Sequence, residues 1–126
     1  MRILLDTHIL LWALAEPARL AKDVAAQLRD PEVDVVYSAV SIAEIAIKAA
    51  QGRIDATPDR VLDAAKRSGF RELELTGRHA ARLAAMPAHH RDPFDRLLVA
   101  QALEEPARLL TADRRLAVYS ELVMVI

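Results

Sequence analysis

Residues 89–102 read HHRDPFDRLLVAQA, where a charged loop changes abruptly into an apolar segment. Asp92 followed by Pro93 predicts a helix that begins with an aspartate N-cap and a proline in its first position. Asp95 then falls in the first turn, and the apolar residues behind it predict that the helix is buried. Taken alone, the two acids favour ordinary capping, because a helix N-terminus attracts negative charge. The positions of the other acids in the chain favour a functional site.

Composition predicts one small globular domain that spans residues 1–126. The chain is 53% hydrophobic and only 4% aromatic, so its core is built from Leu, Val, Ile and Ala. The lack of cysteine excludes disulfides, thiolate metal sites and thiol nucleophiles, and it agrees with a cytoplasmic location. The longest apolar run, Ile9–Ala15, is too short to span a bilayer, so we expect no membrane association. A net charge of −1 argues against a broad basic surface that coats nucleic acid.

Short apolar runs alternate with helical patterns along the whole chain. The runs predict strands near residues 2–5, 35–37, 71–75, 108–111 and 122–126. Helices are expected between them, because the intervening segments carry apolar residues at helical spacing and end at Pro or Gly. Strands that alternate with helices require crossover connections. The pattern therefore predicts an α/β fold with a mainly parallel central sheet that helices cover on both faces.

Four acidic residues fall after strands or near helix starts. Asp6 ends the first strand, Glu44 lies in the helix after the second, Asp95 lies in the first turn of the 93–102 helix, and Asp113 follows the fourth strand. In a parallel sheet, the carboxyl ends of the strands and the N-terminal ends of the helices share one edge, where ligands bind. The sequence therefore predicts that these four carboxylates converge on that edge.

Each of these acids also has a purely structural explanation. Asp6 fits a turn, Asp113 fits a helix start, and Glu44 fits the glutamate of a Ser41-x-x-Glu44 capping box. However, no Lys or Arg is evidently arranged to neutralise any of the four, and carboxylates packed without cations repel each other unless a metal ion joins them. Oxygen ligands alone select a hard ion such as Mg²⁺ or Mn²⁺. Such ions work with phosphates, which indicates hydrolysis of phosphodiester bonds.

Four segments resemble successive motifs of the PIN-domain ribonucleases, and in particular the VapC toxins of type II toxin-antitoxin pairs. They are LDTHILLW (5–12), SIAEIAIK (41–48), HRDPFDRLLVAQA (90–102) and LTAD (110–113). The resemblance implies a three-layer α/β/α sandwich, a Mg²⁺- or Mn²⁺-dependent endoribonuclease, and a VapB-like antitoxin encoded beside it. It also implies metal-binding and catalytic roles for Asp6, Glu44, Asp95 and Asp113, with Asp92 as a cap or a support for the ligands.

Basic residues beside the acids are candidates for holding RNA phosphates. The arginines that flank the acids are Arg91, Arg96, Arg114 and Arg115. A solvated surface explains these arginines as well. His89 and His90 are candidates to contact RNA or to tune the site, although an exposed loop histidine usually does neither. His8 is expected to pack or to cap a helix rather than to bind metal.

Partner binding is expected near the N-terminus of the chain. Leu10, Trp12 and Leu14 belong either to the core or to an apolar groove that receives an antitoxin helix. We also expect the protein to form a homodimer.

Two other functions are compatible with an aspartate after the first strand. A haloacid-dehalogenase-like phosphohydrolase needs a second aspartate two residues after the first, but position 8 is a histidine. A non-catalytic RNA-binding module is the other alternative, and the four intact acids argue against it.

Overall fold

One parallel sheet of five strands organises the molecule, and the computed structural model describes all 126 residues. The strands lie in the order β3-β2-β1-β4-β5, and every pairing between neighbours is parallel. Their bounds are β1 (Arg2–Leu5), β2 (Asp34–Ser38), β3 (Arg71–Leu73), β4 (Arg108–Thr111) and β5 (Val123–Val125). The predicted α/β class with a mainly parallel sheet is confirmed.

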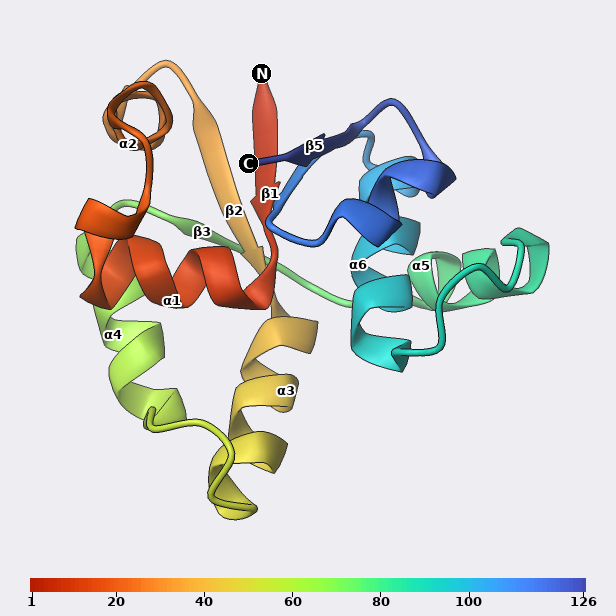
Figure 1. Cartoon of the computed structure of the whole chain (residues 1–126), viewed down its shortest axis with the longest axis horizontal. Coiled ribbons are helices and arrows are strands. Elements are labelled where there is room, and N and C mark those ends of the chain that lie inside the picture. The colour runs from red at the N-terminus through yellow and green to blue at the C-terminus, as the bar shows by residue number, and fades with distance from the viewer.

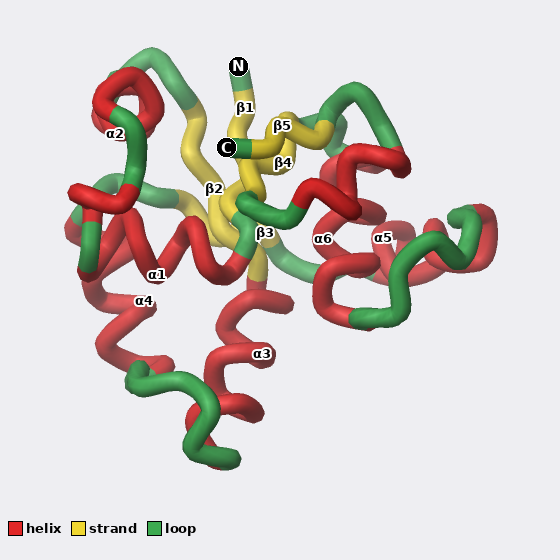
Figure 2. Tube along the Cα trace, in the orientation of Figure 1, coloured by secondary structure: helices red, strands yellow, loops and turns green.

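Helices cover both faces of this sheet (Figure 1). The α-helices are α1 (Thr7–Ala15), α2 (Lys22–Arg29), α3 (Ala39–Ala50), α4 (Pro58–Arg67), α5 (Gly77–Ala81) and α6 (Pro93–Glu104). Short 3₁₀ helices are η1 (Pro17–Arg19), η2 (Arg82–Ala85) and η3 (Arg114–Tyr119). The tube view shows the same arrangement, with the strands between the two groups of helices (Figure 2). None of these helices is long and apolar enough to cross a membrane.

The alternation of side chains along β1 divides the core into two apolar layers. Ile3 and Leu5 pack with buried residues of α1, α2, α3 and α4, whereas Leu4 packs with α6 and η3. This arrangement follows because successive side chains of a strand point to opposite faces of the sheet. The fold is therefore a three-layer α/β/α sandwich, as expected.

Helix caps fix the residues at the carboxyl edge of the sheet. Asp6 caps α1, because its carboxylate accepts the backbone N–H groups of residues 8 and 9. Ser38 caps α3. Glu44 lies in the second turn of that helix, which excludes the capping-box explanation for it. Asp92 caps α6 and Pro93 is its first residue, as predicted.

The order of the strands opens a crevice between β1 and β4. The chain after β1 enters α1 on one face of the sheet, and the chain after β4 enters η3 on the other. A ligand crevice is typical of such a switch point, because the two connections leave the edge in opposite directions. Asp6 and Asp113 follow the two strands that flank it.

Candidate metal centre

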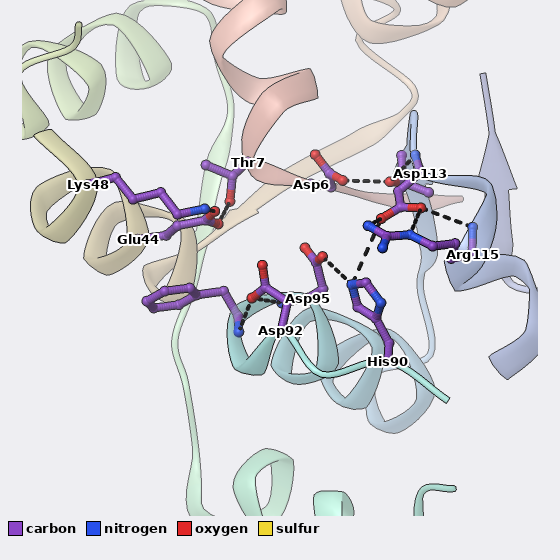
Figure 3. Close-up of polar contacts among 11 residues, drawn as sticks. Asp6, Thr7, Glu44, Lys48, His90, Asp92, Asp95, Asp113 and Arg115 are labelled. Carbon is purple, nitrogen blue, oxygen red and sulfur yellow. Dashed lines mark hydrogen bonds and ion pairs between the residues drawn. The ribbon is translucent and has the colours of Figure 1, made fainter. Parts of the chain in front are cut away.

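An open cleft of about 440 Å³ lies at the carboxyl edge of the sheet. Its wall contains the four predicted acids together with Asp92. Figure 3 shows that these side chains, which come from several elements, face a common space. The four acids are Asp6 after β1, Glu44 on α3, Asp95 on α6 and Asp113 after β4. The structure therefore brings together residues that lie far apart in the sequence.

Asp6 is a buried acid of the cleft, and its side chain is held by neutral donors. The residue is 5% exposed, and its Oδ1 accepts backbone N–H groups from His8 at 2.9 Å and Ile9 at 3.3 Å. Its Oδ2 accepts the hydroxyl of Thr111. Burial raises the pKa of the Asp6 carboxyl, and the Thr111 hydroxyl opposes that rise. The carboxylate is therefore fixed in direction but has no nearby cation bonded to it.

Glu44 is held by a hydroxyl and by an ammonium group. It is 2% exposed, its Oε1 accepts the Thr7 hydroxyl at 2.6 Å, and its Oε2 forms an ion pair with Lys48. Only 15% of the Lys48 side chain is exposed. The expectation that no cation neutralises the acids is therefore wrong for Glu44. This ion pair could have been predicted from the sequence, because Glu44 and Lys48 are four residues apart and such residues lie side by side on a helix.

Asp95 lies against a histidine that sequence reasoning placed in an exposed loop. His90 Nε2 is 2.9 Å from Asp95 Oδ2, and the two side chains are 7% and 18% exposed. Burial raises the pKa of Asp95 to about 6, which the His90 hydrogen bond opposes and the negative charge of Asp92 increases. The loop before Asp92 turns the His90 side chain inward against Asp95, so the prediction that His90 is exposed is wrong.

Asp113 pairs with an arginine at the mouth of the cleft. Its Oδ1 accepts both the backbone N–H and Nε of Arg115 at 3.0 Å, and its Oδ2 accepts Nη2 at 2.8 Å. These hydrogen bonds lower the pKa of Asp113. Asp113 is thus the second acid for which the expected lack of a cation is wrong.

The four arginines predicted to bind RNA have different surroundings. Arg114 and Arg115 line the cleft. Arg91 is exposed and does not line it. Arg96 is half-buried, and its Nη2 donates to the carbonyl oxygen of Met86 at 3.5 Å, so this side chain supports the loop before α6. The exposed His8 does line the cleft, as does Lys48, which was not among the predicted RNA-binding residues.

A second hollow, of about 640 Å³, lies between α1 and α4. Leu11, Trp12 and Leu14 line it, whereas Leu10 is fully buried in the core. The guanidinium of Arg19 lies 4.2 Å from the ring centroid of Trp12. Trp12 also lines the acidic cleft, so one side chain separates the two hollows. The groove interpretation therefore fits Trp12 and Leu14, and the core interpretation fits Leu10.

Comparison with known proteins agrees with this geometry. The profile of the PIN domain family matches residues 3–122. The chain belongs to the PIN-domain family. This PIN domain is 37% identical over 116 residues to Ribonuclease VapC22 of Mycobacterium tuberculosis, a match that covers 90% of this chain and 88% of that protein. It is VapC-like, so the resemblance carried by the four sequence motifs is confirmed.

Solved structures share the fold of this PIN domain. The structure of VapBC2 from Rickettsia felis, bound to a DNA fragment from its promoter, matches with a TM-score of 0.73 at 13% identity and covers 100% of this chain and 98% of that one. FitAcB from Neisseria gonorrhoeae matches with a TM-score of 0.56 at 22% identity, over 90% of this chain and 89% of that one. At these identities the likeness concerns the fold alone.

The donor set of this PIN domain fits a divalent cation. Asp6, Glu44 and Asp95 direct largely buried carboxylates into one cleft, and Asp113 adds a fourth at its mouth. Burial raises the pKa of Asp6 and Asp95 because it disfavours their negatively charged forms. A bound cation would offset that cost by attracting the two negative charges. Hydroxyl and backbone donors orient Asp6 and Glu44, as the groups around metal ligands commonly do.

Proposed function

We propose that this chain is the ribonuclease toxin of a toxin-antitoxin pair. In this proposal it is an endoribonuclease that depends on Mg²⁺ or Mn²⁺ held by Asp6, Glu44, Asp95 and Asp113. The observation that carries the proposal is the convergence of these carboxylates, from four separate segments, in one cleft. The identity to Ribonuclease VapC22 supports the choice of RNA as substrate.

The metal ion, when bound, supplies Lewis acidity that activates water and stabilises negative charge on the phosphate. Neighbouring residues of the chain hold the metal-binding carboxylates in place. Thr111 and two backbone N–H groups hold Asp6, and Thr7 holds Glu44, so the ligands are oriented before any substrate binds. Because these side chains are already fixed, little conformational entropy is lost when the ion binds.

Basic side chains at the rim of the cleft suit a polyanionic chain. Arg114 and Arg115 are exposed, and Lys48 lies deeper beside Glu44. A cleft that is open and lined mainly by polar residues accommodates successive phosphates of RNA better than a small monoester. Membership of the PIN-domain family also argues against a haloacid-dehalogenase-like hydrolase.

An antitoxin is the proposed protein partner, and a homodimer the proposed assembly, in the cytoplasm. The matched structures of VapBC2 and FitAcB support a partner of the antitoxin kind. The groove between α1 and α4, with Trp12 and Leu14 in its wall, is a suitable size for an amphipathic helix of that partner. Sedimentation of the protein alone and with the adjacent gene product tests both assemblies.

Cleavage assays test the enzymatic part. The purified protein is incubated with structured RNA and with a chromogenic phosphomonoester, with Mn²⁺ or with excess chelator. We expect RNA to be cut only with the metal ion, and the monoester to remain intact. Equal RNA cleavage in chelator contradicts the metal-dependent mechanism. Hydrolysis of the monoester without RNA cleavage favours the phosphohydrolase alternative.

Expression in cells tests the toxin role. We expect the protein to inhibit growth when expressed alone and to be harmless when the adjacent gene is co-expressed. Sequencing of the RNA ends left after brief induction identifies the substrate. Unimpaired growth, at levels where folded protein and nuclease activity are confirmed, contradicts the role.

A further inference from the structure

His90 lies between two carboxylates that come from different segments of the chain (Figure 3). Its Nε2 atom is 2.9 Å from Oδ2 of Asp95 and 3.9 Å from Oδ2 of Asp113. One ligand atom from each of the three residues lies within 4.8 Å of the other two. Because only 7% of the His90 side chain is exposed, its ring is packed within the protein beside the two carboxylates rather than extended into solvent.

These separations match the spacing of atoms around one metal ion. An octahedral ion with bonds of about 2.1 Å places adjacent ligand atoms about 3.0 Å apart and opposite ones about 4.2 Å apart. The distances from His90 Nε2 to the two carboxylates, 2.9 and 3.9 Å, fall close to these values. An ion can therefore bind all three residues after small side-chain movements.

The neighbouring structure holds His90 in this position. Asp92 accepts the backbone N–H groups of Phe94 and Asp95, which fixes the chain two residues after His90 at the start of α6. On the other side, Asp113 is bonded to Arg115, whose side chain is 72% exposed. Such an exposed arginine can turn into solvent when an ion binds, and its ion pair with Asp113 is then the attraction that the ion replaces.

We propose that His90 is a nitrogen ligand of the metal ion, beside Asp95 and Asp113, and that it biases the site toward Mn²⁺ and other transition metals over Mg²⁺. The inference rests on the proposed function, because it concerns the same metal centre. Imidazole nitrogen suits transition-metal ions, whereas Mg²⁺ prefers oxygen ligands. The all-oxygen ligand set expected from the sequence is thereby extended by one nitrogen.

Pulsed electron paramagnetic resonance of the full chain loaded with Mn²⁺ tests this directly, because it detects a ¹⁴N nucleus bonded to the ion. We expect a histidine ¹⁴N coupling in the wild type and its replacement by ¹⁵N coupling when the protein is made with ¹⁵N-histidine. The coupling should be lost in His90→Gln. It should persist in two matched variants, His89→Gln from the same loop and His8→Gln from the rim of the cleft.

Calorimetric titration of the same proteins measures the metal preference. We expect His90→Gln to weaken Mn²⁺ binding by about tenfold or more and to change Mg²⁺ binding much less. His89→Gln should leave both affinities unchanged. A variant whose Mn²⁺ to Mg²⁺ affinity ratio equals that of the wild type contradicts the proposal.

The outcomes separate this inference from the proposed function. If the wild type binds Mn²⁺ and cuts RNA but shows no histidine nitrogen coupling, His90 is not a ligand and the proposed function stands. If the wild type binds neither Mn²⁺ nor Mg²⁺, both fail. The isotope measurement uses the unaltered chain, so it decides the matter even where His90→Gln folds poorly.

Discussion

Asp95→Asn should stabilise the metal-free protein at neutral and alkaline pH. Asp95 is an 18% exposed carboxylate whose pKa is raised from 3.8 to about 6, chiefly because burial disfavours its charged form. The folded state therefore binds the Asp95 proton more tightly than the unfolded state does. Asparagine removes the buried charge, and its amide oxygen remains able to accept the hydrogen bond from His90.

The size of the effect follows from the pKa difference. A rise of about two units corresponds to about 3 kcal/mol, which is an upper limit for the cost of ionising Asp95 in the folded protein. Since the buried amide has its own desolvation cost, we expect Asp95→Asn to gain about 1–2 kcal/mol at about pH 8. The gain should shrink as the pH falls through 6 and vanish near pH 4, where the carboxyl of the wild type is protonated in the folded state.

Urea denaturation in excess chelator, followed by circular dichroism at both pH values, measures this difference. Asp63→Asn, an exposed acid on α4, is the matched control and should show no pH-dependent gain. With Mn²⁺ at about pH 8 the order should reverse, because the wild type gains binding energy that Asp95→Asn lacks. If Asp95→Asn is less stable than the wild type at both pH values without metal, the argument from burial is wrong.

Three further changes test neighbouring interactions. Glu44→Gln should lower the metal-free melting temperature, because Lys48 loses its charged partner in a largely buried place, at a cost of about 1 kcal/mol. In filter binding of RNA with Ca²⁺ as the ion, Lys48→Gln should reduce the slope of log affinity against log salt by about 0.7, while Lys66→Gln, on the surface of α4, should not change it. Gln101→Leu breaks a buried hydrogen bond to Ser38 between α6 and the start of α3, so urea denaturation should show a loss of about 1–3 kcal/mol.

Local signals explain why the elements and their order could be predicted from the sequence. Asp92-Pro93 specifies a helix start through one side-chain acceptor and one fixed φ angle, and the structure has both. The 71–75 run predicted a strand, and the structure has β3 at Arg71–Leu73, at the edge of the sheet. Because strand ends and helix starts share one edge of a parallel sheet, the meeting of the four acids also followed from their positions after strands or near helix starts.

The countercharges within the cleft depend on contacts that the sequence shows less directly. The pairing of Lys48 with Glu44 was detectable from their spacing of four residues on a helix. His90 could not be placed, because the path of its loop is set by the cap at Asp92 and by packing around the cleft. Leu10 illustrates the same limit in the core, since its burial depends on which face of α1 meets the sheet.

The four carboxylates should contribute unequally to metal affinity, because they differ in the charge that a metal ion would neutralise. Glu44 already pairs with Lys48, and Asp113 with Arg115, so an incoming ion has to replace an existing attraction at each. Asp6 is bonded only to a hydroxyl and to backbone N–H groups, and burial raises its pKa as it raises that of Asp95. Titration with Mn²⁺ should therefore show larger losses of affinity for Asp6→Asn and Asp95→Asn than for Glu44→Gln and Asp113→Asn. Equal losses for all four would mean that Lys48 and Arg115 leave their acids at no cost, and that the contacts of the metal-free cleft do not govern how it binds an ion.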